Sequence, residues 1–177
     1  MDRKSIGGNL SISPKAHYHN TIMKVLFLDI DGVVNSEDSF AHGGDEYIGI
    51  DPYMAFLVGK ITIAIDDLKV VLSSSWKHSP GGKEEVIKRV TPLFDVTPDV
   101  GAFRGDEIRA WLDAHPEVER YAILDDDNDF HEDQRPNFFR TSWKTGLTEE
   151  IMNKVIEHLN SSNARQEDKP RTTQHEE

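Results

Sequence analysis

Two aspartates separated by one residue follow an apolar run near the start of this sequence. The run Lys24 to Leu28 leads into Asp29-Ile30-Asp31-Gly32, and an extended backbone directs the side chains of residues i and i+2 to the same side. Two carboxylates so close repel each other unless a cation or a shared proton lies between them. The pattern lacks the further acidic residues of a helix-loop-helix calcium loop. It indicates a cation or proton site, or else a turn cap beside a solvated carboxylate.

Two further polar clusters also follow short apolar runs. Val70 to Leu72 precedes Ser73-Ser74-Ser75-Trp76-Lys77, and Tyr121 to Leu124 precedes Asp125-Asp126-Asp127-Asn128-Asp129. Alone, the serines are typical of a turn and the aspartates of a solvated loop. In a parallel sheet, however, the carboxyl ends of neighbouring strands meet at one edge. There the carboxylates would need Mg²⁺, and the hydroxyls would suit its phosphate ligand.

The elements that must position these clusters alternate between strands and helices. Short, wholly apolar runs are typical of strands buried on both faces, and apolar residues at helical spacing separate them. This alternation predicts an α/β fold, a three-layer Rossmann-like arrangement with a mostly parallel sheet. The expected strands are 24–28, 70–72, 93–96, 121–124 and 138–139, and the expected helices are one starting at Asp51-Pro52, one from Ser79-Pro80 to Pro92, one ending at His115-Pro116 and one capped by Thr148.

Composition restricts the class of protein. The chain has 177 residues, of which 37% are hydrophobic, enough for one domain with its own core. We expect that domain at 23–160, between disordered segments at 1–22 and 161–177. The absence of cysteine excludes disulfides, iron–sulfur clusters and thiol nucleophiles. No apolar run is long enough for a membrane span or a secretory signal, which predicts a cytoplasmic protein without a membrane partner.

The three clusters, in this order, resemble the motifs of the haloacid dehalogenase (HAD) superfamily of phosphohydrolases. The strand ending in DxDG[TV] matches Val25 to Val33, the strand ending in Ser or Thr matches Val70 to Ser74, and the strand ending in DD matches Ala122 to Asp126. FLDIDGVVN, VVLSSSW, ILDDDNDF and TGLT are most similar to the HAD domain of Swiss Army Knife RNA repair proteins. The resemblance covers about residues 24–160 and implies a HAD-like, Mg²⁺-dependent phosphomonoester hydrolase.

The resemblance also implies roles for the acidic residues. Asp29 would be the nucleophile that forms an aspartyl phosphate, and Asp31 the acid that protonates the leaving oxygen and later activates water. Mg²⁺ would lie between the Asp29 carboxylate, the Asp31 backbone carbonyl and Asp126. Asp125 would support the metal or its waters.

Other residues would contact the phosphorylated substrate. Ser74 would hold a phosphoryl oxygen, with Ser73 as the alternative because the motif can be shifted by one residue. The superfamily has a Lys or Arg near the start of the helix before the fourth motif, which selects Arg104, with Lys77 as the alternative. Trp76 is expected either to stack a base or sugar, with Lys77 near an adjacent phosphate, or to pack under the neighbouring segment.

The segment between the first two motifs is too short for a large cap domain. Ser36 to Ile50, with Gly43-Gly44 at its turn, predicts a hairpin flap over an open site. An open site favours a phosphate on a large substrate such as a nucleic-acid end, whereas the net charge of −12 opposes nucleic acid and keeps a small-metabolite phosphatase as an alternative. A catalytically idle binding or regulatory domain is a further alternative. Receiver and TOPRIM domains arrange their acidic motifs in a different order.

Overall fold

The computed structural model describes residues 23–42 and 49–161. The disorder expected at 1–22 and over most of 161–177 therefore concerns segments outside the described residues. The strands are β1 (Met23–Leu28), β2 (Lys69–Leu72), β3 (Asp95–Val96), β4 (Val118–Asp125) and β5 (Phe138–Arg140). The helices are α1 (Glu37–His42), α2 (Pro52–Ala64), α3 (Gly82–Arg89), α4 (Arg104–Ala114) and α5 (Glu149–Asn160), with short 3₁₀ helices η1 (Ser75–His78) and η2 (Arg135–Asn137).

All five strands pair in parallel in the order β3-β2-β1-β4-β5. The chain runs outward from β1 to β2 and β3, then returns to place β4 on the other side of β1. This reversal creates a switch point at the carboxyl ends of β1 and β4, where open α/β sheets bind their ligands. The predicted α/β class with a parallel sheet is confirmed, and the described residues contain no large cap domain.

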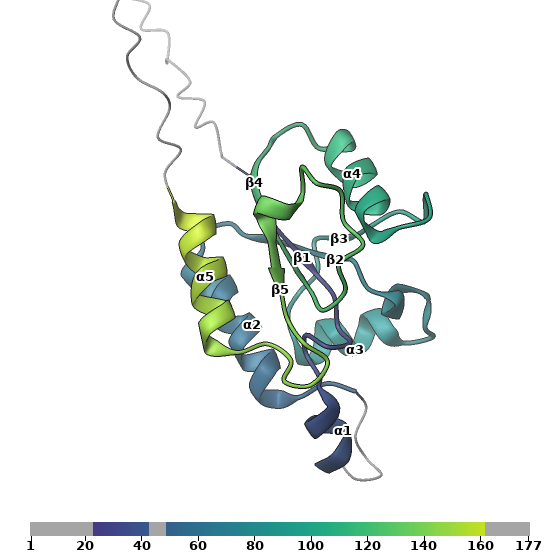
Figure 1. Cartoon of the computed structure of the whole chain (residues 1–177), viewed down its shortest axis with the longest axis vertical. Coiled ribbons are helices and arrows are strands. Elements are labelled where there is room, and N and C mark those ends of the chain that lie inside the picture. The colour runs from purple at the N-terminus through teal and green to yellow at the C-terminus, as the bar shows by residue number, and fades with distance from the viewer. Residues whose placement is uncertain (1–22, 43–48, 162–177) are drawn as a thin grey trace, which may run out of the picture.

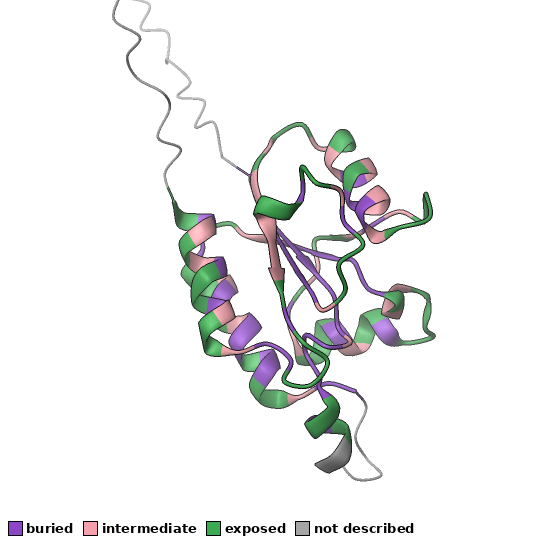
Figure 2. Cartoon of the chain, in the orientation of Figure 1, coloured by how far each residue is buried: buried purple, intermediate pink, exposed green. Residues whose placement is uncertain are grey.

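Helices cover both faces of the sheet (Figure 1). Leu26 and Leu28 of β1 belong to a core with α2, α3 and α5, whereas Val25 and Phe27 belong to a second core with Trp111 of α4. Buried residues accordingly line the central strands and the inward faces of the helices (Figure 2). A strand covered on both faces must be apolar throughout, which explains the uninterrupted run in β1.

Two local predictions were wrong. The helix expected from Ser79-Pro80 begins at Gly82, because Ser79 is extended after η1 and Gly81 adopts a left-handed φ of +76°, neither of which is helical. In the segment expected to be a hairpin, the described part forms α1 instead, and 43–48 lies outside the described residues. The Ser36 hydroxyl accepts a hydrogen bond from the Ser39 amide at 3.3 Å, as at a helix start, which favours α1 over a strand.

None of the helices in the described ranges has both the length and the apolar character that crossing a membrane requires. The predicted cytoplasmic location is a separate matter and stays a prediction.

Candidate active site

Three aspartates converge at the switch point of the sheet. Asp29 follows β1 and Asp125 ends β4, and the backbone pairing continues here because the Asp29 amide donates to the Leu124 carbonyl at 3.0 Å. Asp29, Asp125 and Asp126 each place one carboxylate oxygen so that the three oxygens lie within 4.8 Å of one another. Asp29 and Asp125 are buried, and Asp126 is partly exposed. The two motifs are distant in sequence but form a single acidic cluster.

Gly32 permits this close approach. Its φ of +70° is a conformation that residues with a Cβ rarely adopt. A Cβ built at Gly32 would lie 2.3 Å from Cγ of Asp126. The glycine of the first motif is therefore needed both for the turn and for the room that the Asp126 carboxylate occupies.

The acidic cluster shifts the protonation of its members. Burial raises the pKa of Asp29 to about 6, against the opposing effects of the Arg104 charge and a hydrogen bond from Ser74. Burial, reinforced by the Asp29 charge, raises the pKa of Asp125 to about 8. Burial and then the Asp127 charge raise the pKa of Asp126. The raised pKa values favour a protonated form of Asp125 at neutral pH, and a cation bound beside these carboxyls would favour their charged forms.

The donor set fits Mg²⁺. One oxygen of Asp125, Oδ1, accepts from the Asp127 amide at 2.9 Å, while Oδ2 is buried and has no hydrogen-bond partner among the described residues. Three clustered carboxylates with a buried, unbonded oxygen offer the hard ligands that Mg²⁺ prefers. The Asp31 carboxylate lies outside this cluster, and its predicted contribution through the backbone carbonyl stays a prediction.

Arg104 reaches the cluster from the first residue of α4. Its Nη1 lies 3.5 Å from Oδ1 of Asp29, and its Nε lies 4.0 Å from Oδ2 of Asp125. The Arg104 amide donates to Oδ2 of Asp129 at 3.1 Å, so the acidic loop after β4 also caps α4. From sequence, Asp129 was only one of the aspartates of an acidic loop, and its role in fixing the start of the helix that carries Arg104 was missed.

The two candidate serines differ in their surroundings. Ser74 lies beside Asp29, where its hydroxyl lowers the pKa of that carboxyl, and it lines a pocket beside the cluster. Its Oγ also accepts from the Trp76 amide at 3.4 Å. Ser73 is fully buried, and its Oγ has no partner among the described residues. Ser74 is therefore the serine that the structure brings to Asp29.

Asp31 is held apart from the cluster by two donors. Nδ2 of Asn35 donates to Oδ1 of Asp31 at 2.9 Å, and Nε1 of Trp76 donates to its Oδ2 at 3.1 Å. The buried Asn35 also donates to the Gly49 carbonyl at 2.8 Å, while its Oδ1 accepts from the Gly32 amide at 2.8 Å. Asn35 is the last residue of the motif FLDIDGVVN, but nothing in the sequence indicated that it binds Asp31.

Trp76 is held by a hydrogen bond from its indole and by packing of its ring. Besides the bond from its indole N–H to Asp31, the ring is packed against the core, and a Cβ at Gly49 would lie 2.9 Å from its Cζ2. The side chain is half-buried. These contacts agree with packing under the segment that precedes α2, and the predicted stacking of a substrate on Trp76 stays a prediction.

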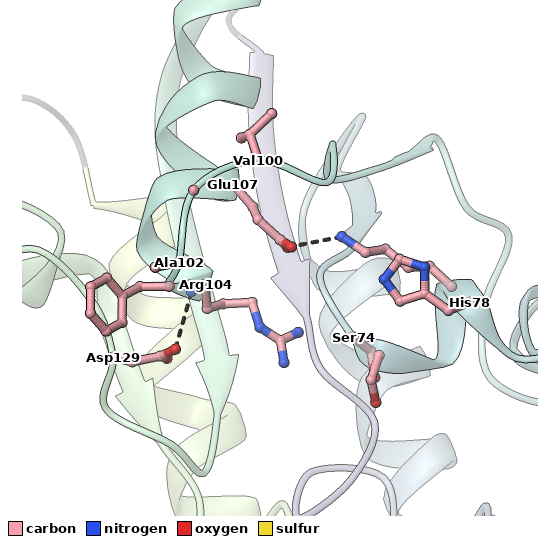
Figure 3. A pocket seen from close by; sticks show the side chains of 11 residues that line it. Ser74, His78, Val100, Ala102, Arg104, Glu107 and Asp129 are labelled. Atoms are coloured by element: carbon pink, nitrogen blue, oxygen red, sulfur yellow. Dashed lines mark hydrogen bonds and ion pairs between the residues drawn. The ribbon is translucent and has the colours of Figure 1, made fainter.

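A pocket of about 250 Å³ opens between η1 and the start of α4. Figure 3 shows the Arg104 side chain extending into it toward the side where Ser74 lies. Lys77 also lines it, but its ammonium pairs with Glu107 at 2.9 Å and Asp99 at 3.0 Å and donates to Thr97. Of the two candidate cations, Arg104 contacts the acidic cluster and Lys77 is occupied by other partners.

Comparison with known proteins gives one match. The family described as the HAD domain in Swiss Army Knife RNA repair proteins matches residues 25–152. No curated protein and no solved structure matches the chain. The matched range begins within β1 and ends in α5, so it contains every site residue described above.

Proposed function

Because the chain belongs to the family of HAD domains in Swiss Army Knife RNA repair proteins, we propose that it is a Mg²⁺-dependent phosphomonoester hydrolase with Asp29 as its nucleophile. The observation that carries the proposal is the convergence of Asp29, Ser74 and Arg104 beside a carboxylate cluster, with Asp31 held separately nearby. A nucleophile, a cation for the phosphoryl group and an acid–base group are the parts that phosphoryl transfer requires.

The reaction proceeds in two displacements at phosphorus. An oxygen of Asp29 attacks the phosphorus, the bond to the leaving oxygen breaks, and a protonated Asp31 transfers its proton to that oxygen. The Asp31 carboxylate then takes a proton from water, whose oxygen attacks phosphorus while the bond to Asp29 breaks. Inorganic phosphate is released and both aspartates return to their starting states.

Positive charge must balance the phosphoryl group throughout. Arg104, with Nη1 3.5 Å from Asp29, would neutralise phosphoryl oxygens, and the Ser74 hydroxyl would donate to one of them. Asp29, Asp125 and Asp126 would hold Mg²⁺, which when bound offsets the negative charge of the cluster and of the incoming phosphate.

The family match ends at residue 152, but α5 continues to Asn160 and buries Val155 and Leu159 in the core. We therefore propose that the catalytic domain extends over 23–160, as its sequence predicts. A catalytically idle domain would be expected to lack one of the reacting groups, and each of them is present here.

Release of phosphate from p-nitrophenyl phosphate tests the proposed chemistry. We expect turnover with Mg²⁺ and none in EDTA, and a loss of at least about 10³-fold in Asp29→Asn because the nucleophile is removed. Asp66→Asn is the matched control. Asp66 is an exposed aspartate just before β2, at the amino-terminal end of that strand and thus away from the carboxyl ends that form the site. Turnover that persists in EDTA, or in Asp29→Asn at the parent rate, would show that the proposed mechanism is wrong.

A further inference from the structure

Two exposed aromatic rings stack on each other at the edge of the candidate site. Phe40 of α1 is 47% exposed and Trp143, in the loop after β5, is 45% exposed. Their ring centroids are 5.4 Å apart at an interplanar angle of 30°. Rings of this size that remain half in water contribute little to the core, so the pair suggests a contact surface.

The loop that carries Trp143 is attached to the backbone of the acidic motifs. Oγ1 of Thr141 donates to the Gly32 carbonyl at 2.7 Å, and the Thr141 amide donates to the Asp125 carbonyl at 2.9 Å. The Glu37 amide donates to the Trp143 carbonyl at 2.8 Å, which joins the loop to α1 (Figure 1). The ring pair is therefore fixed in place relative to Asp29 and its neighbours.

Two exposed cations flank Trp143 in sequence: Arg140 is the last residue of β5, and Lys144 lies in the loop after it. Nε of Arg140 donates to the Asp126 carbonyl at 3.0 Å. The Lys144 amide donates to the Ser142 hydroxyl at 3.2 Å, and its side chain is exposed. Glu37 and Asp38 are exposed on α1, where they would repel a phosphate. A polyanion that uses this surface would therefore run along the end of β5 at Arg140 and the loop that carries Lys144, away from the start of α1.

We infer that Phe40 and Trp143 stack a base, while Arg140 and Lys144 bind the adjoining backbone, of a single-stranded nucleic acid whose terminal phosphate lies at Asp29. The inference rests on the proposed function. Every base presents a flat face, so aromatic stacking beside cations binds single strands with little sequence preference. A protein partner would use the rings but has no need of cations next to a phosphate-binding centre.

The test compares two substrates that share one chemical step. kcat/KM is measured on an end-phosphorylated oligonucleotide and on p-nitrophenyl phosphate for the parent, Trp143→Ala and Trp143→Phe. The ratio of oligonucleotide to p-nitrophenyl phosphate should fall about tenfold in Trp143→Ala and partly recover in Trp143→Phe. Lys144→Ala should lower the ratio less at high salt than at low salt, because its contribution is electrostatic.

Phe56→Ala is the matched control. Phe56 is 58% exposed and stacks with Tyr53 on α2 at a centroid distance of 6.4 Å, yet it contacts no residue placed in the site. We expect the parent ratio in this variant. A parent ratio in Trp143→Ala as well would overturn the inference, as would gel filtration showing a parent dimer that Trp143→Ala separates into monomers.

Binding is measured separately so that the two proposals can fail separately. Fluorescence anisotropy of a labelled, end-phosphorylated oligonucleotide in EDTA does not depend on turnover. One outcome is that the parent shows no hydrolysis of either substrate, while Trp143→Ala weakens oligonucleotide binding about tenfold. In that case the stacking surface is supported and the proposed function fails. If the parent hydrolyses p-nitrophenyl phosphate but binds the oligonucleotide no better than Trp143→Ala, the surface fails alone.

Discussion

Asp31 differs from the other carboxylates of the site because side-chain donors hold both of its oxygens. The donors are Asn35 and Trp76, and they come from opposite sides, one from the turn after β1 and one from η1. A group that must deliver a proton to a leaving oxygen depends on its orientation, since small misplacements reduce the rate strongly. We therefore regard Asn35 and Trp76 as positioning residues for Asp31.

Trp76→Phe tests this role at the level of one hydrogen bond. The variant keeps an aromatic ring at position 76 but removes the N–H that bonds to Asp31. We expect kcat on an alkyl phosphate to fall about tenfold, a part of the 10²–10⁴-fold that general acid catalysis supplies. kcat on p-nitrophenyl phosphate should fall much less, because nitrophenolate leaves without being protonated.

Asp31→Asn gives the upper limit of the effect in the same assay. Equal losses on the two substrates would mean that Trp76 acts only by packing and would contradict a positioning role. Unchanged kcat on both would show that Asn35 alone suffices to orient the carboxylate.

Among the elements, those with a continuous pattern could be predicted from sequence. β1, β2 and β4 each contain an uninterrupted apolar run that leads toward the site. α2 and α5 are capped by Asp51 and Thr148, whose side chains accept from backbone amides as predicted. α1 could not be predicted because it is a short helix of mostly polar residues with no apolar stripe. The strand ends that form the acidic cluster could be predicted because parallel strands bring them to one edge.

Contacts between segments distant in sequence could not be predicted. Asn35 bonds to the Gly49 carbonyl, and Asp129 accepts from the Arg104 amide 25 residues earlier. Each depends on where a loop is placed by the rest of the fold, and no local pattern encodes that. Trp143 was overlooked for the same reason, since only the attachment of its loop to Gly32 and Asp125 brings it near the site.

The start of α4 gives a prediction at the scale of one element. In Asp129→Ala, the Arg104 amide loses its acceptor, and loss of an N-terminal cap costs about 0.5–2 kcal/mol of stability. Because Arg104 is the first residue of that helix, its guanidinium should become less ordered and KM for p-nitrophenyl phosphate should rise. Thermal unfolding and KM are measured together with Asp129→Asn, which keeps an acceptor and should resemble the parent. A raised KM in Asp129→Asn but not in Asp129→Ala would contradict this explanation.

At the scale of the whole molecule, the chain has 32 acidic and 20 basic residues. Within residues 23–42 and 49–161, the buried carboxyls are Asp29 and Asp125, both at the carboxyl ends of strands. Net negative charge of this size already opposes a compact state. Burying Asp29 and Asp125 side by side adds a cost that depends on pH, because it applies to the charged forms. The site therefore links the stability of the fold to protons and to Mg²⁺.

The pH dependence of stability follows from the sign of these shifts. The pKa of Asp125 rises from 3.8 to about 8 in the folded protein, so this group favours folding most below pH 4 and loses that contribution as pH rises toward 8. In EDTA, the melting temperature of the parent should therefore fall from pH 4 to pH 8 more than that of Asp125→Asn. At pH 8 the melting temperature of the variant should exceed that of the parent by several degrees, since about 1 kcal/mol corresponds to about 2–4 °C in a chain of this size.

Saturating Mg²⁺ should raise the melting temperature of the parent at pH 8 but scarcely raise that of Asp125→Asn, because the cation favours the charged carboxylates. Asp66→Asn, an exposed control, should follow the parent throughout. Parallel curves for the parent and Asp125→Asn in EDTA would show that the buried carboxyls do not control the stability of this fold.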